Sequence, residues 1–319
     1  MEKKEYGGYI EFEYFHGMEY HANAIALNSG RHCVEYLIRA KHIRKLYMPY
    51  FLCDSVSYLC AKLGVEVGYY HINLNFVPQF DKVLSDGEWL YIVNFYGQLS
   101  DELLMNFKSC YDRIIVDNAQ AFFRRPLEGV DTCYTCRKFF GVTDGGYLYT
   151  DVALGDELLR DCSYDRMTFL FGRMERSANE FYSQYADNNK MFAGELLKRM
   201  SKVTQNLMRG MDYDRIKVTR MENFRYLHKK LSGINKLKLT IPDGAFMYPL
   251  YINSGAEIRK VLQQKRIYIP TLWPNVFDVC REGSLEYDMA KNILPIPVDQ
   301  RYRIEDMEYL AKEIIKCIS

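Results

Sequence analysis

Residues 114–121 read Ile-Ile-Val-Asp-Asn-Ala-Gln-Ala and place a carboxylate at the end of an apolar run. Residues 113–117 are typical of a buried strand, and ligands of open α/β sheets bind beyond the carboxyl ends of the strands. The pattern therefore predicts that Asp117 lies in a ligand crevice, where a buried carboxylate is costly unless it has a charged partner. An alternative stays open, in which Asp117 caps a following helix and Gln120 is its capping-box partner.

A lysine follows 21 residues after Asp117 (138 − 117). Lys138 lies among apolar and aromatic residues, shortly before the turn Asp144-Gly145-Gly146. A lysine in such surroundings loses its proton more easily and can act as a nucleophile. The alternative is a surface lysine whose stem covers apolar groups, which is the more common case for an isolated lysine.

A third segment, Asn28-Ser29-Gly30-Arg31, joins a predicted strand to a predicted helix. The N–H groups and the dipole at the start of that helix can hold a phosphate, and Gly30 allows close approach. The hydroxyl of Ser29 can add a hydrogen bond. Taken alone, the segment favours an ordinary βα turn in which Ser29 is the helix N-cap, a role that serine often fills.

The three segments together are the protein groups that pyridoxal 5'-phosphate requires. The lysine forms the Schiff base, the carboxylate keeps the pyridine nitrogen protonated, and the helix start takes the phosphate. A nicotinamide site needs G-x-G-x-x-G after the first strand, and a P-loop needs G-K-[ST]. The sequence contains neither motif in these positions.

Short apolar runs that alternate with helical patterns predict an α/β fold, with a mainly parallel sheet covered by helices on both faces. The expected strands are residues 24–27, 46–49, 65–72, 89–95, 113–117, 146–150, 245–252 and 267–269. The expected helices are residues 31–40, 53–63, 101–108 and 304–318, with a further helix over 258–262 and a charged helical region over 167–231. We expect a large domain over residues 1–215 and a smaller α/β domain over 216–319.

Composition excludes several classes of protein. Of the 319 residues, 48% are hydrophobic and 26% are charged, which argues against disorder. The net charge of +1 disfavours nucleic acid as a partner. No apolar run approaches the roughly 18 residues of a membrane span, and residues 1–15 lack the apolar core of a signal peptide. We therefore expect a cytoplasmic protein that does not bind membranes.

The nine cysteines are expected to be reduced rather than bridged. Cys133 and Cys136 form a single C-x-x-C, and the six histidines form no H-x-x-x-H pair. A single short motif of this kind is weak evidence for a site, so we expect no metal.

The chain resembles the DegT/DnrJ/EryC1/StrS family of pyridoxal-phosphate aminotransferases, which have fold type I. The resemblance follows the family's order through most of the sequence, and its specific part is the pair formed by D-x-A-Q and K…D-G-G. The matching segments are 28–31 for the S-G-T phosphate loop, 47–51 for V-P-S-F-T, 94–98 for H-L-Y-G-Q, 117–121 for D-A-A-Q-A, Lys138 with 144–146 for K-x(4)-G-[DE]-G-G, and 294–298 with 306–307 for the closing L-P-x-x-P…D.

The resemblance implies a role for each matching position. Lys138 is the Schiff-base lysine, Asp117 the partner of the pyridine nitrogen, and Gln120 lies near the phenolic oxygen or the substrate. The residues that hold the phosphate are Ser29, Gly30, Arg31 and Thr135. The family builds its site across a homodimer, in which an asparagine of the neighbouring chain often reaches the phosphate, and Asn188 or Asn189 is the candidate here.

The sequence also departs from the family pattern. Arg31 replaces the phosphate-loop threonine, and Thr143 replaces the first glycine of the G-[DE]-G-G turn. Cys53 falls where an aromatic ring stacks on the cofactor, so Phe51 or Tyr50 must substitute for it. The family's G-Y-N-Y-R segment is not recognisable, and the chain is shorter than typical members.

By resemblance, the expected activity is an aminotransferase of sugar biosynthesis. Glutamate is the expected amino donor and a keto-sugar, usually nucleotide-linked, the acceptor, while Lys138 moves a proton as general base and acid. The donor carboxylate needs a basic residue, and the sequence does not rank Arg124, Arg125 and Arg137. Two alternatives remain: other pyridoxal-phosphate chemistry on an amino acid, and a member of the fold without turnover.

Overall fold

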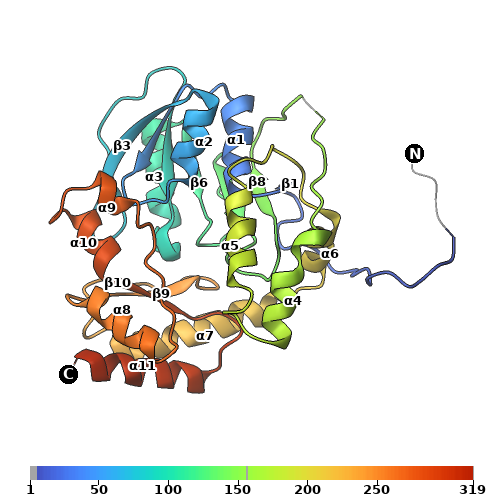
Figure 1. Cartoon of the computed structure of the whole chain (residues 1–319). Helices are drawn as coiled ribbons and strands as arrows, with labels where there is room; N and C mark the ends of the chain where they lie inside the picture. The colour runs from blue at the N-terminus through green and yellow to red at the C-terminus, as the bar shows by residue number, and fades with distance from the viewer. Residues whose placement is uncertain (1–5, 156, 319) are drawn as a thin grey trace.

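An eight-stranded sheet forms the centre of the computed structural model, which describes residues 6–155 and 157–318 (Figure 1). Its strands lie in the order β1-β8-β7-β6-β5-β2-β3-β4. Neighbours among β3, β2, β5, β6 and β7 are parallel, whereas β1, β4 and β8 pair antiparallel. The bounds are β1 Ile25–Leu27, β2 Lys45–Pro49, β3 Glu66–Ile72, β4 Pro78–Gln79, β5 Glu88–Val93, β6 Ile114–Asp117, β7 Asp131–Thr135 and β8 Gly146–Tyr149.

The register of the parallel strands brings their carboxyl ends to one edge. Asp117 at the end of β6 pairs with Val93 at the end of β5 on one side and with Cys133 in β7 on the other. The three residues before Asp117 are apolar and buried, as expected for a strand with both faces covered. The predicted mainly parallel α/β sheet is confirmed.

Helices of the first half cover this sheet. Helix α1 (Gly30–Ala40) begins at the N-cap Ser29 and packs on β7 and β8, and α2 (Ser55–Leu63) packs on α1 and β3. Helix α3 (Asp101–Tyr111) begins at Ser100 and contacts β6. Gly64 ends α2 with a φ of 69°, which glycine adopts without steric cost. Two short 3-10 turns are η1 (Phe95–Gly97) and η2 (Tyr164–Arg166).

The second half is mostly helical and builds a second core around a two-stranded antiparallel sheet. Helices α7, α8 and α11 pack on or beside this sheet, whereas Val276 in α9 and Met289 in α10 belong to the first core. The bounds are α4 Thr168–Glu175, α5 Tyr182–Met191, α6 Lys202–Arg209, α7 Tyr213–Leu231, β9 Met247–Tyr251, α8 Gly255–Gln264, α9 Val276–Val279, α10 Leu285–Asn292, β10 Ile293–Pro297 and α11 Ile304–Ile318.

The domain boundary expected at 215/216 falls in the first turn of α7. Ile216 belongs to the first core, whereas Phe224 and Leu227, two and three turns later, belong to the second. One continuous helix therefore contributes to both cores, and the division into 1–215 and 216–319 stays a prediction.

Arg220 of α7 connects the second half to the central sheet. Its guanidinium is fully buried and lies 4.7 Å from the ring centre of Phe139. It donates hydrogen bonds to the backbone oxygens of Phe139 (3.0 Å) and Ala245 (2.9 Å) and to the side chain of Gln300 (2.8 Å). Such charge-assisted bonds are strong in a low-dielectric interior, so Arg220 fixes the loop that follows Lys138.

Most of the predicted elements are present with boundaries that shift by a few residues. The strand predicted at 267–269 is wrong, because the amide of Ile267 donates to Leu262 O and so closes the end of α8. Arg266 has a φ of 61° there, which turns the chain out of an extended path.

Strand β7 was not predicted because three of its five residues, Asp131, Thr132 and Thr135, are polar. All five are nevertheless buried, since β7 lies between β6 and β8. Asp131 is paired there with Lys41, whose Nζ lies 2.7 Å from Oδ2. A buried carboxylate with a partner of this kind is compatible with an interior strand.

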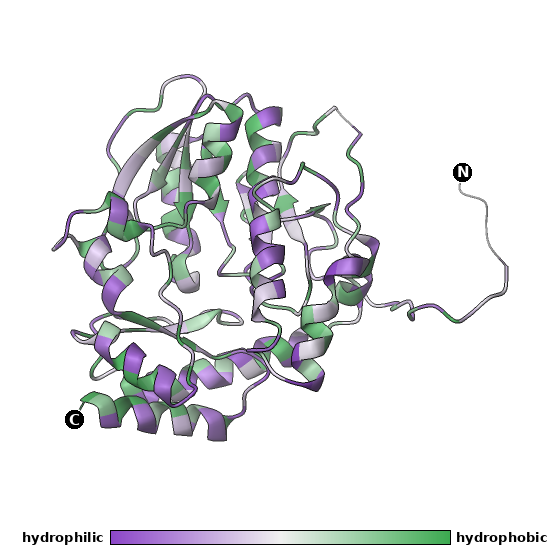
Figure 2. Ribbon diagram, viewed as in Figure 1, coloured by the Kyte–Doolittle hydropathy of each residue, from purple (hydrophilic) through white to green (hydrophobic). Residues whose placement is uncertain are grey.

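Residues 6–12 extend away from the rest of the chain (Figure 1) and expose large apolar side chains, among them Tyr9 and Ile10. Further along, the amide of Phe15 donates to Oδ1 of Asn206 (2.9 Å), which ties this segment to α6. Figure 2 shows apolar residues gathered on the strands of the large sheet, while apolar and polar residues alternate along the helices. Within residues 6–155 and 157–318, no helix is both long and apolar enough to span a membrane. All nine cysteines are unpaired.

Two histidines are buried near the sheet. His21 donates from Nε2 to Phe122 O (2.8 Å) and lies with Nδ1 3.2 Å from the hydroxyl of Tyr149. His32, in the first turn of α1, lies with Nδ1 2.9 Å from the hydroxyl of Ser29. Burial lowers the pKa of each imidazole from 6.5 to about 4.

These lowered pKa values predict a pH-dependent stability. Between pH 6.5 and about 4, both imidazoles take up protons in the unfolded chain but not in the folded one. As the pH is lowered through this window, the free energy of unfolding should therefore decrease, by up to about 1.4 kcal/mol per pH unit for each histidine. Urea unfolding at pH 7 and pH 5 measures the slope. The His21→Gln variant should lose about half of it, and a flat profile in the native protein would contradict two neutral buried imidazoles.

Gly146 is predicted to tolerate no side chain. A Cβ there would lie 2.6 Å from the backbone carbon of Ser29 and 2.9 Å from the amide nitrogen of Gly30. We expect Gly146→Ala to lower the free energy of unfolding by about 1–3 kcal/mol, since backbone atoms cannot move aside as a side chain can. The matched control is Gly233→Ala, where a Cβ meets nothing within 4 Å. Equal stability of the two variants in urea would contradict the close approach.

Candidate active site

The loop between β1 and α1 forms one end of the candidate site. Ser29 is the N-cap of α1, and its hydroxyl accepts a hydrogen bond from the amide of His32 (3.3 Å). A Cβ at Gly30 would lie 3.4 Å from Cβ of Thr135, so the helix start and the end of β7 are neighbours. The structure thus brings Ser29, Gly30 and Thr135 together at a helix N-terminus, where an anion is favoured.

Asp117 is held at the carboxyl end of β6 by two donors. The buried hydroxyl of Tyr91 donates to Oδ2 (2.7 Å), and the amide of Ala119 donates to Oδ1 (2.7 Å). No helix follows among residues 118–130, so the capping-box interpretation is wrong. Gln120 instead accepts from the amide of Tyr96 (2.8 Å), which belongs to the turn after β5. The two donors fix the direction of the carboxylate.

Lys138 lies in the turn after β7 and is exposed. Its Nζ is 5.7 Å from the ring centre of Phe246 and makes no hydrogen bond or ion pair with the described part of the chain. The next residue, Phe139, is fixed through its backbone oxygen by Arg220 (3.0 Å) and Gln300 (2.8 Å). The backbone of this turn is therefore held, while the amine stays free.

The acidic residue of the D-G-G turn has a different role. Asp144 is fully buried and accepts hydrogen bonds from the amide and hydroxyl of Ser201, each at 2.8 Å, and from the hydroxyl of Thr204. Burial raises the pKa of Asp144, and these donors oppose that shift. Asp144 thus fastens α6 to the turn between β7 and β8.

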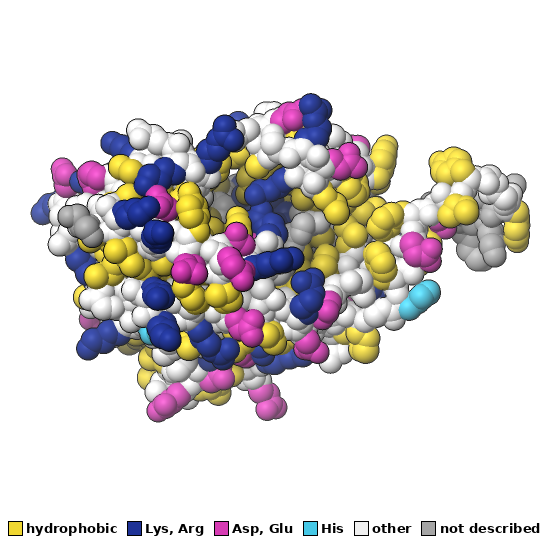
Figure 3. All heavy atoms as spheres, turned by 90° about the horizontal axis from the view of Figure 1, so that it is seen from below, with side chains coloured by type: hydrophobic (Ala, Val, Ile, Leu, Met, Phe, Trp, Pro, Cys, Tyr) yellow, Lys and Arg dark blue, Asp and Glu magenta, His cyan; other side chains and the backbone are white. Residues whose placement is uncertain are grey.

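Two arginines lie beside the helix start. Burial is the main cause that lowers the pKa of Arg31, and the negative charge of nearby Asp54 opposes it. Burial also lowers the pKa of Arg137 to about 10, and the like charge of Arg31 adds to that effect. Arg137 lies 4.5 Å from the ring centre of Phe192 and donates to the side chain of Asn189. In Figure 3, lysine and arginine side chains surround a hollow in the face seen from below.

Helix α5 supplies both candidate asparagines to its own chain. Asn188 is buried and donates from Nδ2 to the backbone oxygen of Thr143 (2.9 Å), and Asn189 accepts from Arg137. The approach of an asparagine from a neighbouring chain stays a prediction.

The aromatic side chains after β2 are engaged elsewhere. The Phe51 ring is buried, 4.6 Å from Trp273 and 5.4 Å from Phe95 between ring centres, and Tyr50 stacks on Tyr69 at 4.9 Å. The predicted stacking of Phe51 on a cofactor stays a prediction, without support from this packing.

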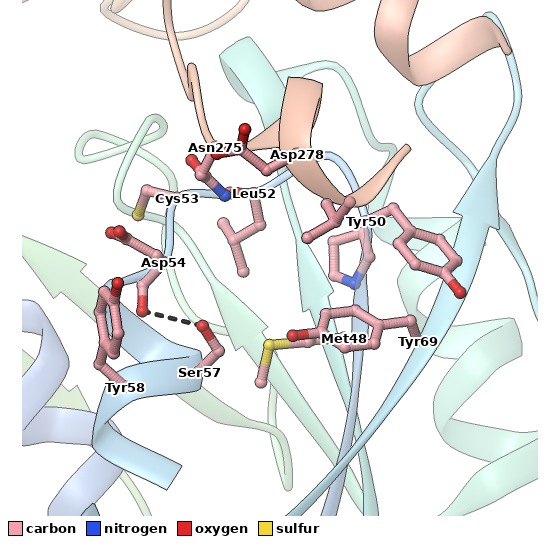
Figure 4. A pocket seen from close by; sticks show the side chains of 12 residues that line it. Met48, Tyr50, Leu52, Cys53, Asp54, Ser57, Tyr58, Tyr69, Asn275 and Asp278 are labelled. Atoms are coloured by element: carbon pink, nitrogen blue, oxygen red, sulfur yellow. Dashed lines mark hydrogen bonds between the residues drawn. The ribbon is translucent and has the colours of Figure 1, made fainter. Parts of the chain in front are cut away.

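A cavity of about 300 Å³ lies between the β2–α2 loop and α9 (Figure 4). Asn275 joins its two walls, since Nδ2 donates to Leu52 O at 2.8 Å. Asp54 lines the cavity together with Cys53, and its charge also acts on Arg31, so the cavity adjoins the candidate site. Further lining groups are Tyr50, Ser57, Tyr58, Tyr69 and Asp278.

Sequence reasoning missed Tyr91, Arg220 and the neighbourhood of Arg31 and Arg137. Tyr91 stands in the middle of an apolar strand, where its ring predicted only core packing. Arg220 lies in a charged helix of 19 residues, and its sequence neighbours do not distinguish it from the solvent-facing side chains. No sequence motif relates Arg31 to Arg137, because they become neighbours only through the order of β1, β8 and β7 in the sheet.

Comparison with other proteins gives structural matches. No family model matches the sequence, and no curated protein matches it either. By contrast, the structure matches several solved proteins over about nine-tenths of its length.

DesV from S. venezuelae is 17% identical, with a TM-score of 0.62, over 92% of this chain and 84% of that one. NtdA from Bacillus subtilis, solved with bound cofactor PMP, is 14% identical with a TM-score of 0.65, over 92% and 72%. A DegT DnrJ EryC1 StrS aminotransferase from Brucella abortus is 11% identical with a TM-score of 0.62, over 92% and 85%. At such identities the likeness establishes the fold: this chain has the fold type I architecture of the DegT/DnrJ/EryC1/StrS sugar aminotransferases.

Proposed function

We propose that the chain is a pyridoxal-phosphate-dependent aminotransferase that moves an amino group from glutamate to the keto group of a sugar, usually nucleotide-linked. The observation that supports the proposal is that three segments share one edge of the sheet. They are the α1 N-terminus beside Thr135, the fixed carboxylate of Asp117, and the turn with the free amine of Lys138. Similar structures include NtdA with PMP and a putative sugar aminotransferase from Streptococcus pneumoniae in its PLP form.

The residues present fit the cofactor. The helix start offers N–H groups to a phosphate, and the absence of a side chain at Gly30 leaves room next to Thr135. The Nε of the partly buried Arg137 is itself buried and has no hydrogen-bond partner, which an anion would supply. Bound there, pyridoxal phosphate would supply an electron sink for the α-carbon of the amino donor.

Asp117 would act through its charge and its fixed direction. Both oxygens already accept a hydrogen bond, from Tyr91 and from Ala119, so the carboxylate cannot turn away. An oxygen has a further lone pair free to accept from a protonated ring nitrogen. Burial at the strand end strengthens that interaction, since the local dielectric is low.

Lys138 would form the covalent link to the cofactor and later carry a proton. Its Nζ has no competing polar partner among the described residues, and the ring of Phe246 lies 5.7 Å away. The Lys138 amine at this point would take the proton from the α-carbon of the donor and deliver it to the C4′ carbon of the cofactor. The bonds to Phe139 O hold the turn while the side chain moves.

The cavity beside Cys53 is the proposed place for the acceptor. Tyrosine rings and hydrogen-bonding groups line it, which suits a ligand that combines flat sugar faces with hydroxyls. We further propose a homodimer in the cytoplasm, in line with the resemblance to the aminotransferase family.

Absorbance of the purified protein tests the proposal. We expect a band near the visible region after addition of pyridoxal phosphate, its loss on addition of glutamate, and a borohydride-reducible link found at Lys138 by mass spectrometry. Lys138→Ala should show none of these. The control is Lys230→Ala, which removes another exposed lysine near an aromatic ring, 5.8 Å from Tyr226. Identical behaviour of Lys138→Ala and the native protein would refute the catalytic role.

Removal of the Asp117 charge tests the second group. Asp117→Asn keeps an oxygen for the Tyr91 hydroxyl but cannot hold a proton on the ring nitrogen. We expect amino transfer to fall by about 100-fold or more, with the Lys138 link still formed. Single-turnover conversion with glutamate measures the effect. The exposed Asp306→Asn should react at the native rate, and an unaffected Asp117→Asn would remove Asp117 from the mechanism.

A further inference from the structure

Arg31 and Arg137 are two neighbouring cations without a carboxylate partner. Their like charges act on each other, and neither forms an ion pair with residues 6–155 or 157–318. Arg137 uses one nitrogen to bond Asn189, its plane lies over the Phe192 ring at 4.5 Å, and its Nε is buried without a partner. Arg31 makes no hydrogen bond within the same residues.

An arrangement of this kind is unfavourable by itself. A partly buried charge without an ion-pair partner is costly, and a second cation nearby adds repulsion. The negative groups that face the pair, Asp54 and Asp144, offset this cost only in part, since the pKa of each arginine stays lowered. Asp144 is used by Ser201 and Thr204, Asp54 forms no ion pair within the described chain, and burial keeps His32 neutral near pH 7. An oxyanion between the guanidinium groups would relieve the cost.

We propose that Arg31 and Arg137 form a clamp for the phosphate of pyridoxal phosphate, assembled within one chain and oriented by Asn189 of α5. The inference rests on the proposed function. It assigns Arg137 to the cofactor phosphate rather than to the carboxylate of the amino donor. It also explains why an arginine can stand where the resembling family has a threonine, because charge replaces the hydroxyl.

Position favours a phosphate over a carboxylate. Arg31 is the second residue of α1, so the clamp lies at the helix N-terminus where backbone N–H groups and the dipole also favour negative charge. Arg137 directly precedes Lys138 and lies in the turn after β7, two residues beyond Thr135, which touches Gly30. Two guanidinium groups and a helix start match a dianion better than a monoanionic carboxylate.

Titration with pyridoxal phosphate, with pyridoxal and with inorganic phosphate tests the clamp. We expect Arg31→Gln and Arg137→Gln each to weaken binding of pyridoxal phosphate by about ten- to hundredfold, with little change for pyridoxal. Inorganic phosphate should raise the midpoint of thermal unfolding of the native apoprotein but not of the variants. Arg137→Lys, which keeps the charge, should recover part of the affinity. Arg44→Gln, which removes an exposed partner of Asp86, is the control.

Several outcomes overturn the clamp. Equal loss of affinity for pyridoxal and pyridoxal phosphate would mean that the arginines do not act on the phosphate. Unchanged cofactor binding with a higher saturating concentration of glutamate would assign them to the donor carboxylate instead. If Arg137→Gln fails to fold, the binding measurements on Arg31→Gln and Arg31→Thr test the clamp instead, because Arg31 forms no hydrogen bond within the described residues that these changes would remove. Absence of a Lys138 link in the native protein would refute the proposed function, whereas native-like cofactor binding in the arginine variants would refute the clamp alone.

Discussion

The candidate site depends on the close approach of two backbones, at Gly146 in β8 and at Ser29 before α1. No Cβ fits between them, and the pairing of Leu27 with Gly146 holds β1 in place beside β8. Because β8 inserts antiparallel between β1 and β7, the helix start comes to lie against Thr135, and the turn with Lys138 follows directly. Gly146 therefore sets the spacing between the N-terminus of α1 and the turn that carries Lys138.

Near these two backbones, some polar side chains have hydrogen-bond partners and others have none within the described residues. Asp117 has two donors and Asp144 has three, so these carboxylates are fixed. Lys138, Arg31 and the Nε of Arg137 lack such partners within the described residues. Buried polar atoms are usually satisfied in folded proteins, so the unpaired Nε of Arg137 marks a place where a ligand would complete the structure.

The sequence predicted the groups that lie close to strand ends, because an apolar run followed by a polar residue has a direct structural meaning. Asp117 and the start of α1 were found in this way. Strand β7 was not predicted because its composition is polar, although it is buried between two strands. The strand predicted at residues 267–269 was wrong because the amide of Ile267 donates to the end of helix α8. The contact of Asn188 with Thr143 and the pairing of Arg31 with Arg137 arise from packing between distant segments, which no local pattern encodes.

Arg220 gives the molecule a mechanical property. A single guanidinium holds Phe139, Ala245 and Gln300, which come from the Lys138 turn and from two parts of the second core. The turn and the elements around Ala245 and Gln300 are therefore coupled through one side chain. A displacement of those elements relative to the large sheet would pull on the backbone of the Lys138 turn, so that closing over a substrate and turning the Lys138 side chain would be one movement instead of two.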